Sequence, residues 1–177
     1  KAICYNHGIL LDSGPYLPEN APQVSNFQIT SPTTNGQYIF KDGPIGCTMQ
    51  FNDVNPEDMD FLRVRLQYAA TGSSNWVQFD EHDVGSINSW DWYSFNFYGS
   101  ALPAGTWQIR AVVDDDMMEG ISPTTVTVII DRVAPASTVS PITPYWKTAS
   151  PFTITAAASD DASGVKEVKL YYQYRPS

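Results

Sequence analysis

The chain has 177 residues, of which 42% are hydrophobic, 13% aromatic and 16% charged. This apolar content excludes wholesale disorder, and the length is enough for one full domain of about 100 residues and part of another. Ten basic and nineteen acidic residues give a formal net charge of -9, which disfavours nucleic acid and anionic membranes as partners. No apolar run approaches the roughly 20 residues that a transmembrane helix needs, so we predict no membrane span in this segment.

Residues 1–21 are predicted to be an N-terminal arm or linker, because they hold the turn-forming runs Asp-Ser-Gly-Pro and Pro-Glu-Asn-Ala-Pro. Cys4 lies in this arm, and Cys47 is the only other cysteine. Two cysteines without CxxC spacing are too few for a metal cluster. We favour a Cys4–Cys47 disulfide, as in a secreted chain. The alternative is a free Cys47 that fills space in the core.

Residues 22–133 show short runs in which apolar side chains recur with a period of two, separated by Gly, Pro, Asn and Asp. This pattern is typical of β-strands and turns, and no helical periodicity is present. The predicted strands are Val24–Thr30, Tyr38–Phe40, Ile45–Asn52, Phe61–Ala69, Trp76–Phe79, Trp92–Tyr98, Gly105–Val113 and Ser122–Ile130.

Alternation along these strands predicts which side chains face inward. The inward sets include Cys47, Met49 and Phe51, then Val64 and Leu66, then matching residues of the later strands. Two sheets that bury such sets against each other make a sandwich. We therefore predict an all-β fold, an Ig-like antiparallel β-sandwich of about seven strands.

The pattern restarts after the junction at residues 131–135. Arg63–Tyr68, with the sequence RVRLQY, is similar to Glu167–Tyr172, with the sequence EVKLYY. This internal repeat predicts a second Ig-like module over residues 134–177 that contains only its first strands. Such a module is either truncated or completed by another segment, because its sheet face is uncovered.

Ser159–Tyr172, preceded by Pro151–Thr155, resembles the tandem Ig-like or fibronectin-III-like repeats of archaeal and bacterial surface and secreted proteins. The resemblance covers residues 134–177 clearly and residues 22–133 more weakly, through Asn75-Trp76 and Gly105–Ala111. It implies an extracellular or cell-surface location and a spacer, filament or adhesion role. It brings no shared catalytic residues.

Acidic residues cluster in the loops that an Ig topology places at one end of the sandwich, where they predict a calcium site because calcium prefers several oxygen ligands. A second predicted site lies at the junction between the modules. The alternative is that these carboxylates only form turns and keep the surface soluble. We favour this alternative, in which no cofactor is required, because no EF-hand-like spacing supports calcium. The candidate ligands are Asp53, Asp58, Asp114, Asp115, Asp116 and Glu119 at the loop end, and Asp131, Asp160 and Asp161 at the junction.

Four aromatic residues are candidates for an interface or for stacking against a ligand: Trp76, Trp90, Trp92 and Tyr98. Trp92 and Tyr98 fall on the outward phase of their strand, where they suit either a neighbouring module or a polysaccharide. We favour the module contact.

Catalytic signatures are missing from the sequence. It has no GxSxG, HExxH or P-loop motif, and we place His82 in a polar turn. We therefore predict a non-enzymatic structural or assembly module of a surface layer, filament or stalk, whose partners are copies of itself or neighbouring modules. The alternative is an accessory domain of a larger secreted enzyme or adhesin that binds a polysaccharide or a surface protein.

Overall fold

The computed structural model describes residues 5–6, 9–10, 20–34, 36–53, 62–85, 89–144 and 147–173. Within these residues the chain is all-β, with one short 3-10 helix and no α-helix. The strands are β1 Tyr5–Asn6, β2 Ile9–Leu10, β3 Gln23–Ile29, β4 Tyr38–Phe40, β5 Pro44–Asn52, β6 Arg63–Ala70, β7 Val77–Asp83, β8 Asp91–Tyr98, β9 Gly105–Asp114, β10 Glu119–Ile121, β11 Val126–Ile130, β12 Ala136–Val139 and β13 Ala156–Ser159.

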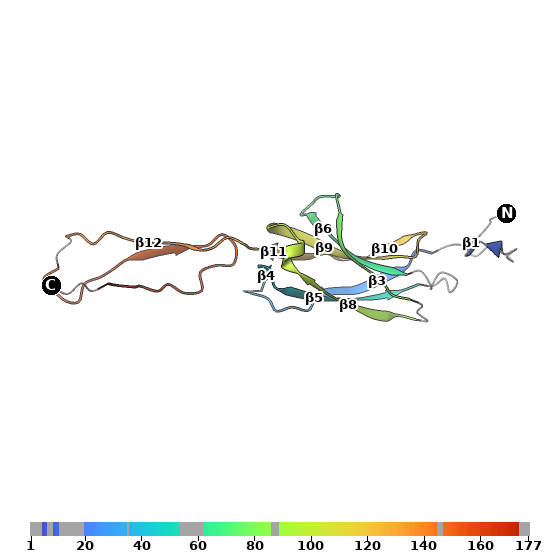
Figure 1. Ribbon diagram of the computed structural model, residues 1–177, viewed down its shortest axis with the longest axis horizontal. Helices are drawn as coiled ribbons and strands as arrows, with labels where there is room; N and C mark the ends of the chain where they lie inside the picture. Colours follow the sequence, from blue (N-terminus) through green and yellow to red (C-terminus); the bar gives the residue numbers. More distant parts are fainter. Residues whose placement is uncertain are drawn as a thin grey trace.

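Two sheets form the body of the molecule and lie face to face as two layers (Figure 1). One has three antiparallel strands in the order β3-β5-β8. The other has six strands, in the order β4-β11-β9-β6-β7, with β10 paired to β9. Strands β5, β6 and β8 alternate buried and more exposed side chains, because successive residues of a strand point to opposite faces. The architecture is a β-sandwich.

The core lies between the two sheets and is apolar. Every strand from β3 to β11 except β4, β7 and β10 contributes buried apolar side chains to it, and Ile45, Met49, Val64, Leu66 and Ile109 have no exposed surface. Tyr68 closes one side through edge contacts with Phe79 and Trp107, at ring-centroid distances of 5.8 and 5.0 Å. The inward faces predicted from alternation are confirmed for these residues.

The six-stranded sheet carries ion pairs on its outer face. Arg65 of β6 donates to Asp114 of the neighbouring strand β9 and to Glu119 of β10, the latter at 2.8 Å, and Arg63 pairs with Asp116. Arg65 and Asp114 are each only 14% exposed at the side chain. These pairs hold the end of β9 and the β9–β10 turn against β6.

Two predicted boundaries were wrong. β7 continues to Asp83, so His82 lies on a strand and not in a turn; its ring stacks near Tyr93 at 5.5 Å and its Nε2 is 3.0 Å from Asp80. The last predicted strand, Ser122–Ile130, is shorter in the structure: β11 begins at Val126, and Ser122 lies before it and donates its hydroxyl to the carbonyl of Thr124. In β7 cross-strand contacts outweigh the local polar composition, whereas before β11 the side-chain hydrogen bond of Ser122 to the backbone favours a turn.

Residues 134–144 and 147–173 belong to a separate hairpin beyond one end of the sandwich (Figure 1). Its only strands in the described residues are β12 and β13, which pair antiparallel from Ala136↔Ser159 to Val139↔Ala156. The predicted strand at 167–172 falls in a described stretch that carries no strand pairing. No helix in the described part of the chain has the length and apolar content needed to cross a membrane.

Candidate functional site: the module junction and the exposed faces

The junction between sandwich and hairpin is built by two consecutive residues after β11. Asp131 donates its backbone N–H to the carbonyl of Phe40, which fixes the end of β11 beside β4. The guanidinium of Arg132 donates to Asp42 at 2.9 Å and to the carbonyls of Gly99 and Leu102 at 3.0 and 2.9 Å. Two separate parts of the sandwich, the end of β4 and the 3-10 turn after β8, therefore hold the start of the linker in place.

Asp131 also reaches the hairpin. Its Oδ1 accepts from the N–H of Val133 at 2.9 Å, and its Oδ2 accepts from the N–H of Ser163 at 3.0 Å. Ser163 and these backbone donors lower the pKa of the Asp131 carboxyl, because hydrogen bonds to the charged form favour it. Asp131 is thus an ionised group that links the end of the sandwich to the hairpin loop.

Asp160 organises the loop that meets Asp131. Its Oδ1 accepts from the N–H groups of Ala162 and Gly164 at 3.1 and 2.9 Å and lies 3.2 Å from the hydroxyl of Ser163. Its Oδ2 is buried and has no hydrogen-bond partner. One carboxylate oxygen each from Asp131, Asp160 and Asp161 lies within 4.8 Å of the others. We call these three residues the junction cluster.

At the opposite end of the sandwich the predicted loop-end ligands have other roles. Asp114, Asp116 and Glu119 pair with Arg63 and Arg65, which neutralise their charge. Asp115 is 3% exposed, and its Oδ1 accepts from the N–H groups of Met117 and Met118 at 2.8 and 2.6 Å. Asp53 is also buried, and Asp58 lies outside the described residues. Among the described residues, only the junction cluster groups three or more metal-ligating side chains.

The candidate aromatic residues divide into two kinds. Trp76 is half-buried and stacks beneath the guanidinium of Arg110, 4.2 Å from the ring centroid, so it belongs to the surface of the six-stranded sheet. Trp90, Trp92 and Tyr98 are 44%, 51% and 60% exposed. The last two stand on the outer face of β8, as the alternation predicts.

Cys47 is a free thiol on β5 with 1% exposure. Burial, with a smaller contribution from the charge of Asp80, raises its pKa to about 12, so the group stays protonated and behaves as a small apolar side chain. Cys4 lies outside the described residues, and the disulfide stays a prediction.

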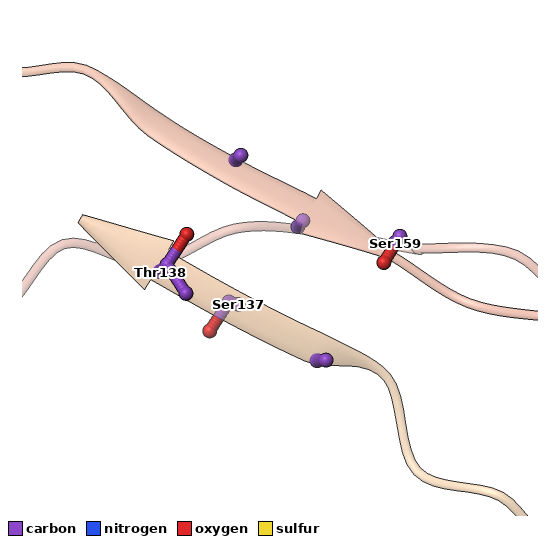
Figure 2. A pocket seen from close by; sticks show the side chains of 6 residues that line it. Ser137, Thr138 and Ser159 are labelled. Atoms are coloured by element: carbon purple, nitrogen blue, oxygen red, sulfur yellow. The ribbon is translucent and has the colours of Figure 1, made fainter. Parts of the chain in front are cut away.

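The hairpin exposes most of its apolar side chains. Phe152, Val168, Leu170 and Tyr172 are 50%, 56%, 54% and 90% exposed. A shallow hollow on the β12–β13 pair is lined only by small side chains, among them Ser137, Thr138 and Ser159 (Figure 2). Sequence reasoning did not find this hollow, although the run of small residues at 156–159 is its signal.

A scan against models of protein families and a search of curated proteins found no match for this chain.

Proposed function

We propose that this protein is a non-enzymatic structural module of an extracellular assembly, such as a surface layer, filament or stalk. The observation that carries the proposal is the uncovered apolar face of the hairpin. Val168 and Leu170 repeat the sequence positions of Val64 and Leu66, which are fully buried in the sandwich. Exposed apolar rows of this kind mark an interaction surface.

The strand order supports an Ig-like module. In an Ig-type sandwich the strands A, B and E share one sheet and C, F and G share the other. Here β3, β5 and β8 form one sheet, while β6, β9 and β11 are neighbours in the second. The parallel pairing of β4 with β11 closes the edge of that second sheet. In this reading the hairpin is the beginning of a second module of the same kind.

The mechanism is contact between modules. We propose that a strand from a neighbouring subunit pairs with an open edge of the hairpin, as in strand addition to a sheet. Its side chains would then cover the exposed apolar face. The small side chains in the hollow of Figure 2 leave room for a second layer to approach the β12–β13 pair. The hydrogen bonds of Asp131 and Arg132 fix the linker, so that such contacts transmit a defined spacing.

Calcium is the ion that we propose for the junction cluster, because three carboxylates and the unpartnered Oδ2 of Asp160 suit a hard cation. Bound there, the ion would stiffen the connection between modules. The test is a calcium titration followed by the amide NMR signals of residues 160–164. Saturable shifts that Asp160→Asn removes are expected, and unchanged signals at millimolar calcium would contradict the ion.

Association between copies tests the proposed assembly. Light scattering and electron microscopy of the purified chain should show ordered oligomers that grow with concentration. Leu170→Asp places a charge on the uncovered face and should abolish them, whereas Tyr171→Asp, on the opposite phase of the same stretch, should not. A monomer at every concentration, or equal effects of the two variants, would contradict assembly through this face.

Accessory ligand binding is a second candidate function. Exposed Trp92 and Tyr98 on β8 favour it, since their ring faces are open to stacking with a ligand.

A further inference from the structure

The outer face of the three-stranded sheet is uncharged. Outward positions on β5 and β8 hold amide and hydroxyl side chains between two aromatic rings, and those of β3 are also polar and neutral. This composition stands out in a chain with a net charge of -9. We call it the neutral face and define it by Thr48, Gln50, Trp92, Ser94, Asn96 and Tyr98.

Strand pairing arranges this face in rows. Trp92 is opposite Gln50, Ser94 is opposite Thr48, and Tyr98 is opposite Pro44 at the far end. Next to Asn96, Gly46 has no side chain, and a Cβ there would lie 2.7 Å from the hydroxyl oxygen of Thr30. The rows therefore present the short polar groups of Ser94 and Asn96 as a floor between the two rings, while the hydroxyl oxygen of Thr48 is buried.

The polar groups are oriented. Asn26 on β3 donates its side-chain amide to the Oε1 of Gln50, which leaves the Nε2 of Gln50 as a donor. Ser94 and Asn96 are exposed and add hydroxyl and amide groups, each able both to donate and to accept. A ligand with many hydroxyls and no charge satisfies such groups, while an ion finds no opposite charge on this face.

The two aromatic rings set the length of the ligand. Trp92 and Tyr98 are six residues apart on one strand, which separates them by about 20 Å at about 3.3 Å per residue. Both rings are more than half exposed. Their apolar faces can pack against the C–H faces of sugar rings, while the groups between them hydrogen-bond sugar hydroxyls. One monosaccharide cannot reach both ends.

We propose that the neutral face binds a neutral polysaccharide lying along β8, with Trp92 and Tyr98 stacking on separate sugar units. A second copy of the chain is a weaker fit, because the core of a protein interface is mainly apolar and this floor is polar. The proposal is independent of assembly through the hairpin, since the neutral face and the hairpin are separate surfaces (Figure 1).

Affinity electrophoresis in native gels tests the proposal, and the acidic chain migrates readily in such gels. The probes are hydroxyethyl cellulose, dextran, galactomannan and arabinoxylan, with alginate as the anionic control. We expect at least one neutral polymer to retard the protein and alginate not to. Trp92→Ala should weaken the retardation about tenfold. Trp76→Ala is the matched control, because it removes an indole from the other sheet and should change nothing.

Thermal midpoints of the variants establish that each one is folded. If Trp92→Ala proves unstable, Asn96→Asp replaces it, because this exposed change introduces charge without removing a ring and should also weaken the retardation. Retardation by no neutral polymer, retardation by alginate, or equal loss in the Trp92 and Trp76 variants would overturn the proposal. A dimer in sedimentation that Trp92→Ala dissolves would overturn it in favour of a second copy.

Discussion

Residues 63–68 of β6 and residues 167–172 have similar alternating sequences, RVRLQY and EVKLYY, but their side chains differ in burial. Leu66 has no exposed surface, whereas Leu170 is 54% exposed. β6 is paired with β7 on one side and β9 on the other, and the three-stranded sheet covers its inner face. The hairpin stretch has no such neighbours among the described residues. Alternation therefore marks apolar side chains that need burial, and the neighbouring strands decide whether they are buried.

The largest expected effect is the loss of unfolding free energy when Leu66, and not Leu170, is shortened. Leu66→Ala leaves a cavity in the core and should lower the free energy of unfolding by about 2 to 5 kcal/mol. Leu170→Ala, at the repeated position, should change it by less than about 0.5 kcal/mol. Urea unfolding of dilute, monomeric protein measures both. Similar losses for the two variants would show that the hairpin face is already covered.

The strands and their inward faces were predictable because alternation is a local property of the sequence. The ion pairs of Arg65 were not, since they depend on the register that brings Asp114 of β9 beside β6. The same register assigns Asp114 and Glu119 to arginines, although their loop positions resemble those of metal ligands. The arrangement of Asp131 with Asp160 and Asp161 was foreseeable only as a possibility, because it depends on how the linker is fixed.

Close packing at Gly120 gives the next largest effect. A Cβ on Gly120 of β10 would lie 1.8 Å from the carbonyl oxygen of Pro22, so the backbone itself must move. Gly120→Ala should therefore destabilise the sandwich by about 1 to 3 kcal/mol. Gly43→Ala is the control, because no atom lies within 4 Å of its added methyl group. Equal thermal midpoints for both variants would mean that β10 does not pack on the start of β3.

The rate at which Cys47 reacts with a thiol reagent tests whether it lies in the interior of the sandwich. Burial raises the pKa of Cys47 to about 12, so iodoacetamide at pH 8 should label this residue at least about a hundredfold more slowly in the folded chain than in urea. Mass spectrometry of peptides measures the rates. In urea without reductant, a label on Cys47 shows a free thiol, and its absence until reduction shows the disulfide with Cys4. Rapid labelling of the folded chain would contradict the buried position.

The smallest effect concerns the junction that joins the two regions. Because the folded-state pKa of Asp131 is lowered from 3.8, its ionised form stabilises the contact with Ser163 above about pH 4, and the contact weakens as pH falls through the lowered value. The amide NMR signal of Ser163 should follow this titration. Asp131→Asn should weaken the pH dependence, whereas Asp161→Asn should retain it, since Ser163 donates to Asp131. A Ser163 signal that is insensitive to pH between 5 and 2 would show that the hairpin is not held by Asp131, and the fixed spacing between the modules would then rest on Arg132 alone.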